Sequence, residues 1–80
     1  MNGIQRPLSS LPVGKGSVIT VSALKGPLAL RLEELGLFAG TGVICRGRAP
    51  SGSPGAYEAL GTTLALRRED AERILVQPWD

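Results

Sequence analysis

Short apolar runs alternate with turns that contain glycine or proline along most of this chain. Residues 17–24 (SVITVSAL) are apolar and rich in β-branched side chains, which favours a first strand. The runs at 41–48, 56–60, 62–67 and 74–76 predict four further short strands. Because side chains alternate across a strand, Val43 and Cys45 are expected to point inward, and Leu64 and Leu66 share one face. The pattern therefore predicts a mainly β fold.

One segment has the periodicity of a helix. Leu28, Leu32 and Leu35 recur at i, i+4 and i+7, which places them on one helical stripe. Gly36 follows that stripe as a natural C-cap. Leu30 lies off the stripe, roughly opposite Leu28, and is expected to face solvent. Residues 68–73 predict a second, shorter helical turn with acidic residues at its start.

Frequent chain breakers keep every element short. Eleven glycines and six prolines occur in 80 residues, and Leu8 and Leu11 can cap one end of a thin core. The prediction is a single domain over residues 1–80. It is a small closed barrel of about five strands, with one helix between the first two strands and a helical turn before the last. Closure is expected because it removes exposed strand edges.

Composition sets limits on partners and compartment. The formal charge is +2, and the last forty residues carry as many acidic as basic side chains. That balance is too weak for a dedicated nucleic-acid binder. The chain lacks a run of eighteen apolar residues and an apolar stretch at its start, so neither membrane insertion nor a signal peptide is expected. A single cysteine fits a reducing compartment, and a cytoplasmic location follows.

The inventory of reactive side chains argues against an enzyme. Histidine is absent, and the only cysteine, Cys45, has no partner for a disulfide or a CxxC metal site. On an inward strand position it is expected to act as a small apolar residue. We predict no catalytic residue, no cofactor and no metal site.

Three weaker patterns have simple structural explanations. The stretch at residues 14–17 (GKGS) lacks the spacing and the preceding strand of a phosphate-binding loop, and predicts a turn. The acidic residues are expected on solvated helix faces, because hard cations need several converging oxygens. These residues are Glu33, Glu34, Glu69, Asp70 and Glu72. Arg46, Arg48, Arg67 and Arg68 form a candidate basic patch, but the chain has only three aromatic residues, Phe38, Tyr57 and Trp79, too few to alternate with them for base stacking.

Five stretches, in order and spacing, give the chain a resemblance to a known family. They are residues 8–14 (LSSLPVG), 31–37 (RLEELGL), 40–41 (GT), 48–54 (RAPSGSP) and 64–71 (LALRREDA), the last running into 74–76. Together they resemble the ferrous iron transport protein A (FeoA) family over nearly the whole chain. One departure is in the loop, where Ser53 and Gly55 replace the family's usual aspartate and aliphatic residue. Serine braces a turn more weakly than aspartate, so a more mobile loop is expected.

The resemblance implies an SH3-like barrel and an accessory role. Such a protein would be a cytosolic regulator of ferrous iron uptake that contacts the cytosolic domains of the FeoB membrane GTPase, reaching the membrane only through that partner. The alternative is a stand-alone SH3-like regulatory domain, related to those of metal-dependent transcriptional repressors. Nucleic acid is not an expected partner, and weak self-association stays open. The candidate partner-binding residues are Leu30, Phe38, Arg46, Arg48 and Arg67.

Overall fold

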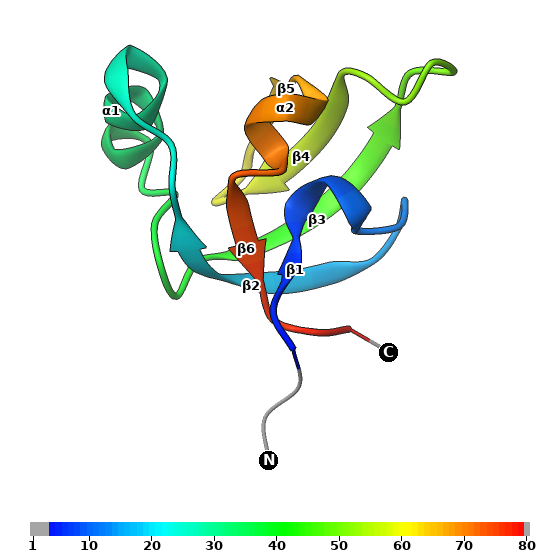
Figure 1. Cartoon of the computed structure of the whole chain (residues 1–80), viewed down its shortest axis with the longest axis horizontal. Helices are drawn as coiled ribbons and strands as arrows, with labels where there is room; N and C mark the ends of the chain where they lie inside the picture. Colours follow the sequence, from blue (N-terminus) through cyan, green and yellow to red (C-terminus); the bar gives the residue numbers. More distant parts are fainter. Residues whose placement is uncertain (1–3, 80) are drawn as a thin grey trace.

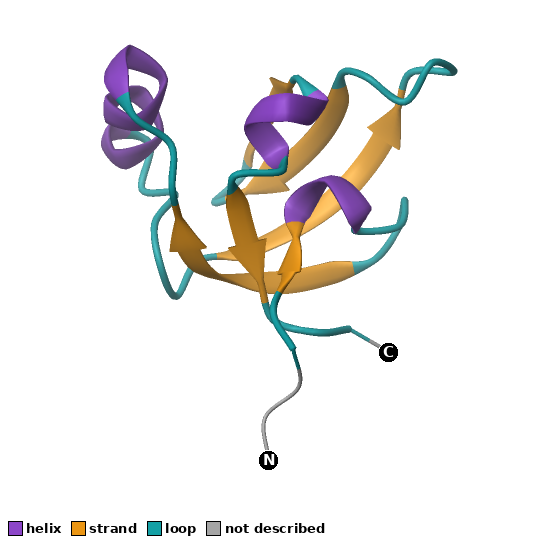
Figure 2. Cartoon of the chain, in the orientation of Figure 1, coloured by secondary structure: helices purple, strands orange, loops and turns teal. Residues whose placement is uncertain are grey.

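The computed structural model describes residues 4–79 and shows a strongly bent sheet with three short helices around it (Figures 1 and 2). Six strands and three helical segments follow one another along the chain. In order they are β1 (Arg6–Pro7), the 3-10 helix η1 (Leu8–Ser10), β2 (Gly16–Ser22), α1 (Gly26–Glu34), β3 (Gly42–Arg48), β4 (Gly55–Ala59), β5 (Thr62–Leu66), α2 (Arg68–Ala71) and β6 (Ile74–Val76).

All strand pairs are antiparallel, and the sheet order is β1-β6-β2-β3-β4-β5. The last strand of the chain, β6, therefore lies between β1 and β2. Irregularities interrupt the β2–β6 ladder between Ile19 and Val21, and the β3–β4 ladder between Cys45 and Gly47. These bulges increase the local bend of the strands, which suits a barrel-like curvature.

The inner face of the sheet carries the core. β4 shows the simplest alternation, since Gly55, Tyr57 and Ala59 are buried and the residues between them are not. Leu8 and Leu11 close one end of the core, as the sequence predicts. The fully packed apolar cluster comprises Leu8, Leu11, Ile19, Leu32, Leu37, Val43, Cys45, Tyr57, Ala59, Leu66, Ala71, Ile74 and Val76.

Helix α1 ends as its sequence predicts. Gly36 has a φ of +86°, the left-handed conformation that glycine adopts without strain. The Leu37 amide donates to the Leu32 carbonyl and the Gly36 amide donates to the Glu33 carbonyl. This pattern satisfies carbonyls that a helix end would otherwise leave unpaired. Leu32 is buried, and Leu28 and Leu35 pack partly buried against the core.

A two-residue turn, Leu60-Gly61, joins β4 to β5. Both residues have positive φ, 55° and 77°, which defines a type I′ hairpin turn. Leucine seldom adopts this conformation, because its Cβ then crowds the backbone. The Leu60 side chain lies against the end of α1, and a Cβ on Gly36 would sit 2.7 Å from its Cδ1.

The mainly β, SH3-like fold is confirmed, but the expectation of a closed barrel is wrong for the described residues. β1 and β5 are the two edges of the sheet and do not pair with each other. Instead, η1 packs against α2 and β6 near this opening. The predicted strand count also misses β1. This strand has only two residues, Arg6 and Pro7, which is too few to produce an alternating pattern in the sequence.

Candidate functional site

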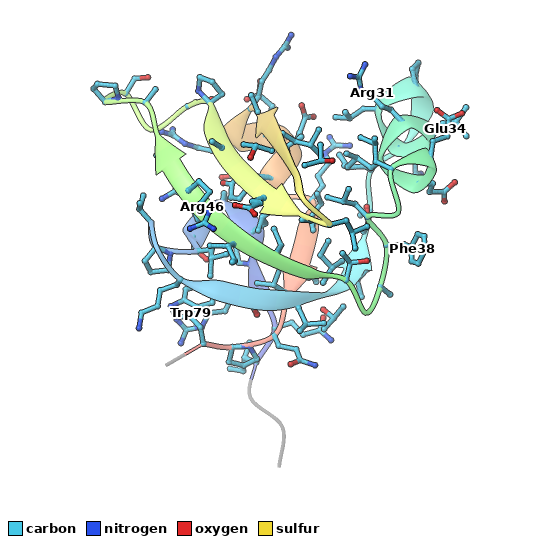
Figure 3. The ribbon with its side chains drawn as sticks, turned by 180° about the vertical axis from the view of Figure 1, so that it is seen from behind. Arg31, Glu34, Phe38, Arg46 and Trp79 are labelled. Atoms are coloured by element: carbon cyan, nitrogen blue, oxygen red, sulfur yellow. The ribbon has the colours of Figure 1, made fainter. Side chains whose placement is uncertain are left out.

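Two exposed apolar side chains flank the C-terminal part of α1. Leu30 is 58% exposed and Phe38, in the loop after the helix, is 55% exposed. The Thr41 hydroxyl holds this loop in place. It accepts a hydrogen bond from the Phe38 amide at 3.3 Å and donates one to the Gly36 carbonyl at 2.8 Å. The backbone at Phe38 is thus fixed while its ring faces outward (Figure 3). Both residues lie where the sequence places them, away from the core.

A small cleft of about 220 Å³ lies between α1 and the same loop. Leu24, Ala29, Leu32 and Phe38 contribute apolar walls, and Glu33 adds a carboxylate. Leu30 does not line this cleft. A hollow with a mixed polar and apolar lining beside an exposed aromatic side chain is typical of protein contact surfaces.

The arginines do not form one patch. Arg46 lies on the outer face of β3, where its Nε is 2.5 Å from a carboxylate oxygen of Glu58 on β4. Because both side chains are partly exposed, this ion pair contributes little to stability. It does neutralise the cation on this part of the surface.

Arg48 takes a different direction from Arg46. Its guanidinium donates to the Leu11 carbonyl at 2.9 Å and to the Tyr57 hydroxyl at 3.3 Å. The bond to Tyr57 raises the pKa of Arg48, so the group stays charged. Strand alternation alone would put Arg46 and Arg48 on one face, but the bulge between Cys45 and Gly47 turns Arg48 inward.

Arg67 and Arg68 stand where β5 meets α2, and both are exposed. Arg68 is hydrogen-bonded to the 49–54 loop. Its amide donates to the Ser53 hydroxyl at 3.0 Å, and its guanidinium donates to the Ser51 carbonyl at 2.9 Å. Ser53 therefore does brace the loop, by accepting one backbone N–H group. The glycine at position 55 also has a structural explanation, since a Cβ there would sit 2.7 Å from the Tyr57 hydroxyl.

The outer sheet face has a feature that the sequence did not reveal. A shallow hollow of about 540 Å³ crosses β2, β3 and β4. Its lining includes Gly16, Gly42, Ile44, Glu58 and Leu60. The only advance signal was the unusual leucine before Gly61 in a hairpin turn, because an exposed apolar residue there gives no benefit to the turn itself.

The chemistry available for catalysis or metal binding is sparse. Cys45 is fully buried and its thiol contacts the Gly47 carbonyl at 3.6 Å. Among residues 4–79, no three His, Cys, Asp or Glu side chains gather in a way that could hold a metal ion. The glycines around Lys15 form a turn, in which the Lys15 amide donates to the Pro12 carbonyl. Within the described range, every helix is too short or too polar to cross a membrane.

Comparisons with known proteins point to one family and one fold. A family model described as the FeoA domain matches residues 6–78. The solution structure of the FeoA protein from Chlorobium tepidum is 34% identical, with a TM-score of 0.84 over 89% of this chain and 68% of that one. The crystal structure of Stenotrophomonas maltophilia FeoA complexed with zinc, described as a prokaryotic SH3 domain protein, is 32% identical. Its TM-score is 0.74 over 94% of this chain and 91% of that one.

The same fold occurs in a different functional class. A manganese-dependent transcriptional repressor matches with a TM-score of 0.81 over 99% of this chain but 39% of its own, at 14% identity. That identity shows the fold alone. Among the curated proteins, none matches the chain.

Proposed function

The chain belongs to the FeoA domain family, and on this basis we propose that it is an accessory, regulatory protein of ferrous iron uptake that contacts the FeoB membrane GTPase. The observation that carries the proposal is the family match over residues 6–78. The Stenotrophomonas relative has itself been suggested as a ferrous iron transport activating factor. In this proposal Fe²⁺ is the cargo of the partner, and the chain acts from the cytosolic side.

The chemistry of the surface supports a role in binding. The described residues offer exposed apolar side chains and cationic groups, but no gathered ligands for iron and no exposed nucleophilic thiol. Ferrous iron in proteins is usually held with the help of imidazole or thiolate ligands. A protein with this surface would alter its partner through shape and charge complementarity.

We propose that the contact surface includes Leu30 and Phe38, with Arg67 as a charged neighbour of the partner. Arg46 would join this surface together with Glu58, as a neutral ion pair. Leu30 and Phe38 are exposed apolar groups held on rigid backbone, which reduces the entropy lost on binding. Arg48 would act indirectly, because its guanidinium is engaged with Leu11 and Tyr57.

Pull-down with the cytosolic domains of the GTPase tests this proposal. Leu30→Asp should weaken capture at least about tenfold, because it places a carboxylate in an apolar contact. Val13→Asp is a matched control, since Val13 is 56% exposed but lies in the turn before β2. If a folded Leu30→Asp protein is captured as well as the unaltered chain, Leu30 is not part of the contact surface. Normal ferrous uptake in a deletion strain, together with no complex for the unaltered chain, would overturn the function.

The second candidate is a stand-alone regulatory domain of the metal-dependent repressor type. The likeness of fold to the manganese-dependent repressor favours it. This function predicts binding to a DNA-binding protein and no dependence of ferrous uptake on the chain, so the deletion experiment separates the two.

A further inference from the structure

Strand β5 is an edge strand, and one of its two edges pairs with no other strand among the described residues. It pairs with β4 alone, and it stands at the end of the sheet order. The opposite edge, β1, has only two residues, and one of them is Pro7. Proline and short length are common ways in which proteins protect a sheet edge from further pairing. The two edges of this sheet are therefore unequal.

The hairpin geometry identifies which backbone groups of β5 are free. A two-residue turn makes the flanking residues, Ala59 and Thr62, a hydrogen-bonded pair. Bonded and non-bonded pairs alternate, so the next bonded positions on β5 are Leu64 and Leu66. The N–H and C=O groups of Thr63 and Ala65 consequently point away from β4. Outside that ladder, no hydrogen bond among residues 4–79 reaches either residue, and both are exposed.

The β5 edge also lacks the usual obstacles to pairing. Its five residues, Thr62–Leu66, include no proline and no charge. Its register with β4 runs without a shift, whereas the β2–β6 and β3–β4 ladders are both irregular. A regular, uncharged edge is a template for an added strand, in which backbone hydrogen bonds provide affinity.

Charge indicates what kind of strand would fit. Arg67 directly follows β5 and is exposed, and the one ion pair among residues 4–79 is Arg46–Glu58. A strand added antiparallel to β5 begins beside Leu66 and Arg67. Acidic residues at its amino end would meet the Arg67 guanidinium, and apolar residues would follow beside the half-buried Leu64.

A second copy of this chain fits less well. In antiparallel pairing of β5 with itself about Leu64, Arg67 faces residue 61, and residues 60–66 contain no acid. A five-residue edge also buries far less than the roughly 1,600 Å² typical of stable protein interfaces. We propose that β5 binds an extended, acidic-then-apolar segment of a partner protein by strand addition. This inference rests on the proposed function insofar as that partner is the regulated GTPase.

The direct test uses amide NMR spectra of the full chain and synthetic peptides. The first peptide has two aspartates followed by alternating valine and threonine, the second has two lysines instead, and the third carries N-methyl groups on alternate amides of the first. The acidic peptide should shift the Thr63 and Ala65 amides and slow their hydrogen exchange. It should bind about tenfold more tightly than the lysine peptide at low salt, a preference that screening reduces. The N-methyl peptide should not bind.

Variants of one residue test the edge itself. Ala65→Pro removes an outward N–H group and keeps the β4 ladder, since proline is tolerated where its nitrogen faces solvent. Ala65→Glu places a carboxylate at the same position, where it repels the aspartates of the peptide, and Ala56→Glu is its matched control. Ala56 pairs with Ala65 but lies on a central strand, one strand further from the added one. We expect both Ala65 variants to lose the acidic peptide and Ala56→Glu to bind it more tightly than Ala65→Glu does.

Several results would overturn the inference. These are unshifted Thr63 and Ala65 amides at millimolar peptide, equal binding of the N-methyl peptide, or unchanged binding by a folded Ala65→Glu protein. Shifts at these amides that depend only on protein concentration would identify a second copy as the occupant. If the unaltered chain captures the GTPase and the Ala65 variants capture it equally, strand addition is wrong while the proposed function stands. If the unaltered chain fails to capture it, the proposed function fails.

Discussion

Replacing Arg48 with methionine should destabilise the protein even though arginine is normally a surface residue. Methionine keeps much of the apolar stem but removes both hydrogen bonds, to the Leu11 carbonyl and to the Tyr57 hydroxyl. A bond from a charged donor contributes about 1.5–3 kcal/mol, and a neutral buried hydroxyl left without its partner costs about 1 kcal/mol. Because Arg48 is only half-buried, we expect the lower part of the sum, about 2.5–3 kcal/mol.

Urea denaturation monitored by circular dichroism measures this loss. For a domain of this size the midpoint of thermal unfolding should fall by about 10–20 °C. Tyr57→Phe should cost about 0.5–1.5 kcal/mol, and in that background Arg48→Met should cost less than it does alone. The raised pKa of Arg48 means that its contribution is fully present below the pKa of the unfolded arginine. Stability from this group should therefore not change between about pH 6 and 9.

Two results would refute this reasoning. A loss of unfolding free energy below about 0.5 kcal/mol would show that the bonds from Arg48 to Leu11 and Tyr57 do not stabilise the fold. An additive double mutant would show that Arg48 and Tyr57 do not interact. If, in addition, Arg48→Met abolished capture of the GTPase without changing stability, Arg48 would belong to the contact surface and not to the scaffold.

Three further predictions follow from single contacts. Gly36→Ala should cost about 1–2 kcal/mol in urea unfolding, because alanine is strained at φ +86°, and its Cβ would also crowd Leu60; an unchanged midpoint would contradict this. Cys45 is buried, so iodoacetamide should label it only under denaturing conditions, and rapid labelling of the native protein would show that the core opens. Trp79→Ala should cost about 1 kcal/mol, because it removes the ring that lies 5.1 Å below the Arg6 guanidinium; Arg6→Ala should cost less, since the ring also packs on the core.

Much of the fold was predictable because local signals and tertiary packing agree. Ile74–Val76 forms the predicted last strand, and Gly36 ends the helix as expected. Val43 and Cys45 point inward, and Leu64 shares a face with Leu66. In each case one periodicity or one conformational requirement decides the outcome, and no distant residue opposes it.

The errors come from features that depend on pairing between distant segments. A bulge has no strong local signature, so the inward turn of Arg48 could not be read from alternation. Closure of a sheet depends on where its two edges meet, which strand lengths alone do not determine. The unpaired edge at Thr63 and Ala65 was missed for the same reason, because a closed barrel has no edge.

The position of β6 has a consequence for synthesis of the protein. This strand is the last in the chain, yet it supplies the neighbours of both β1 and β2. During synthesis β1 and β2 leave the ribosome well before residues 74–76, although β2 can already pair with β3. Until β6 arrives, β2 therefore has an open edge, which nascent chains can pair wrongly. The slow step of folding should be the insertion of this late strand between two early ones.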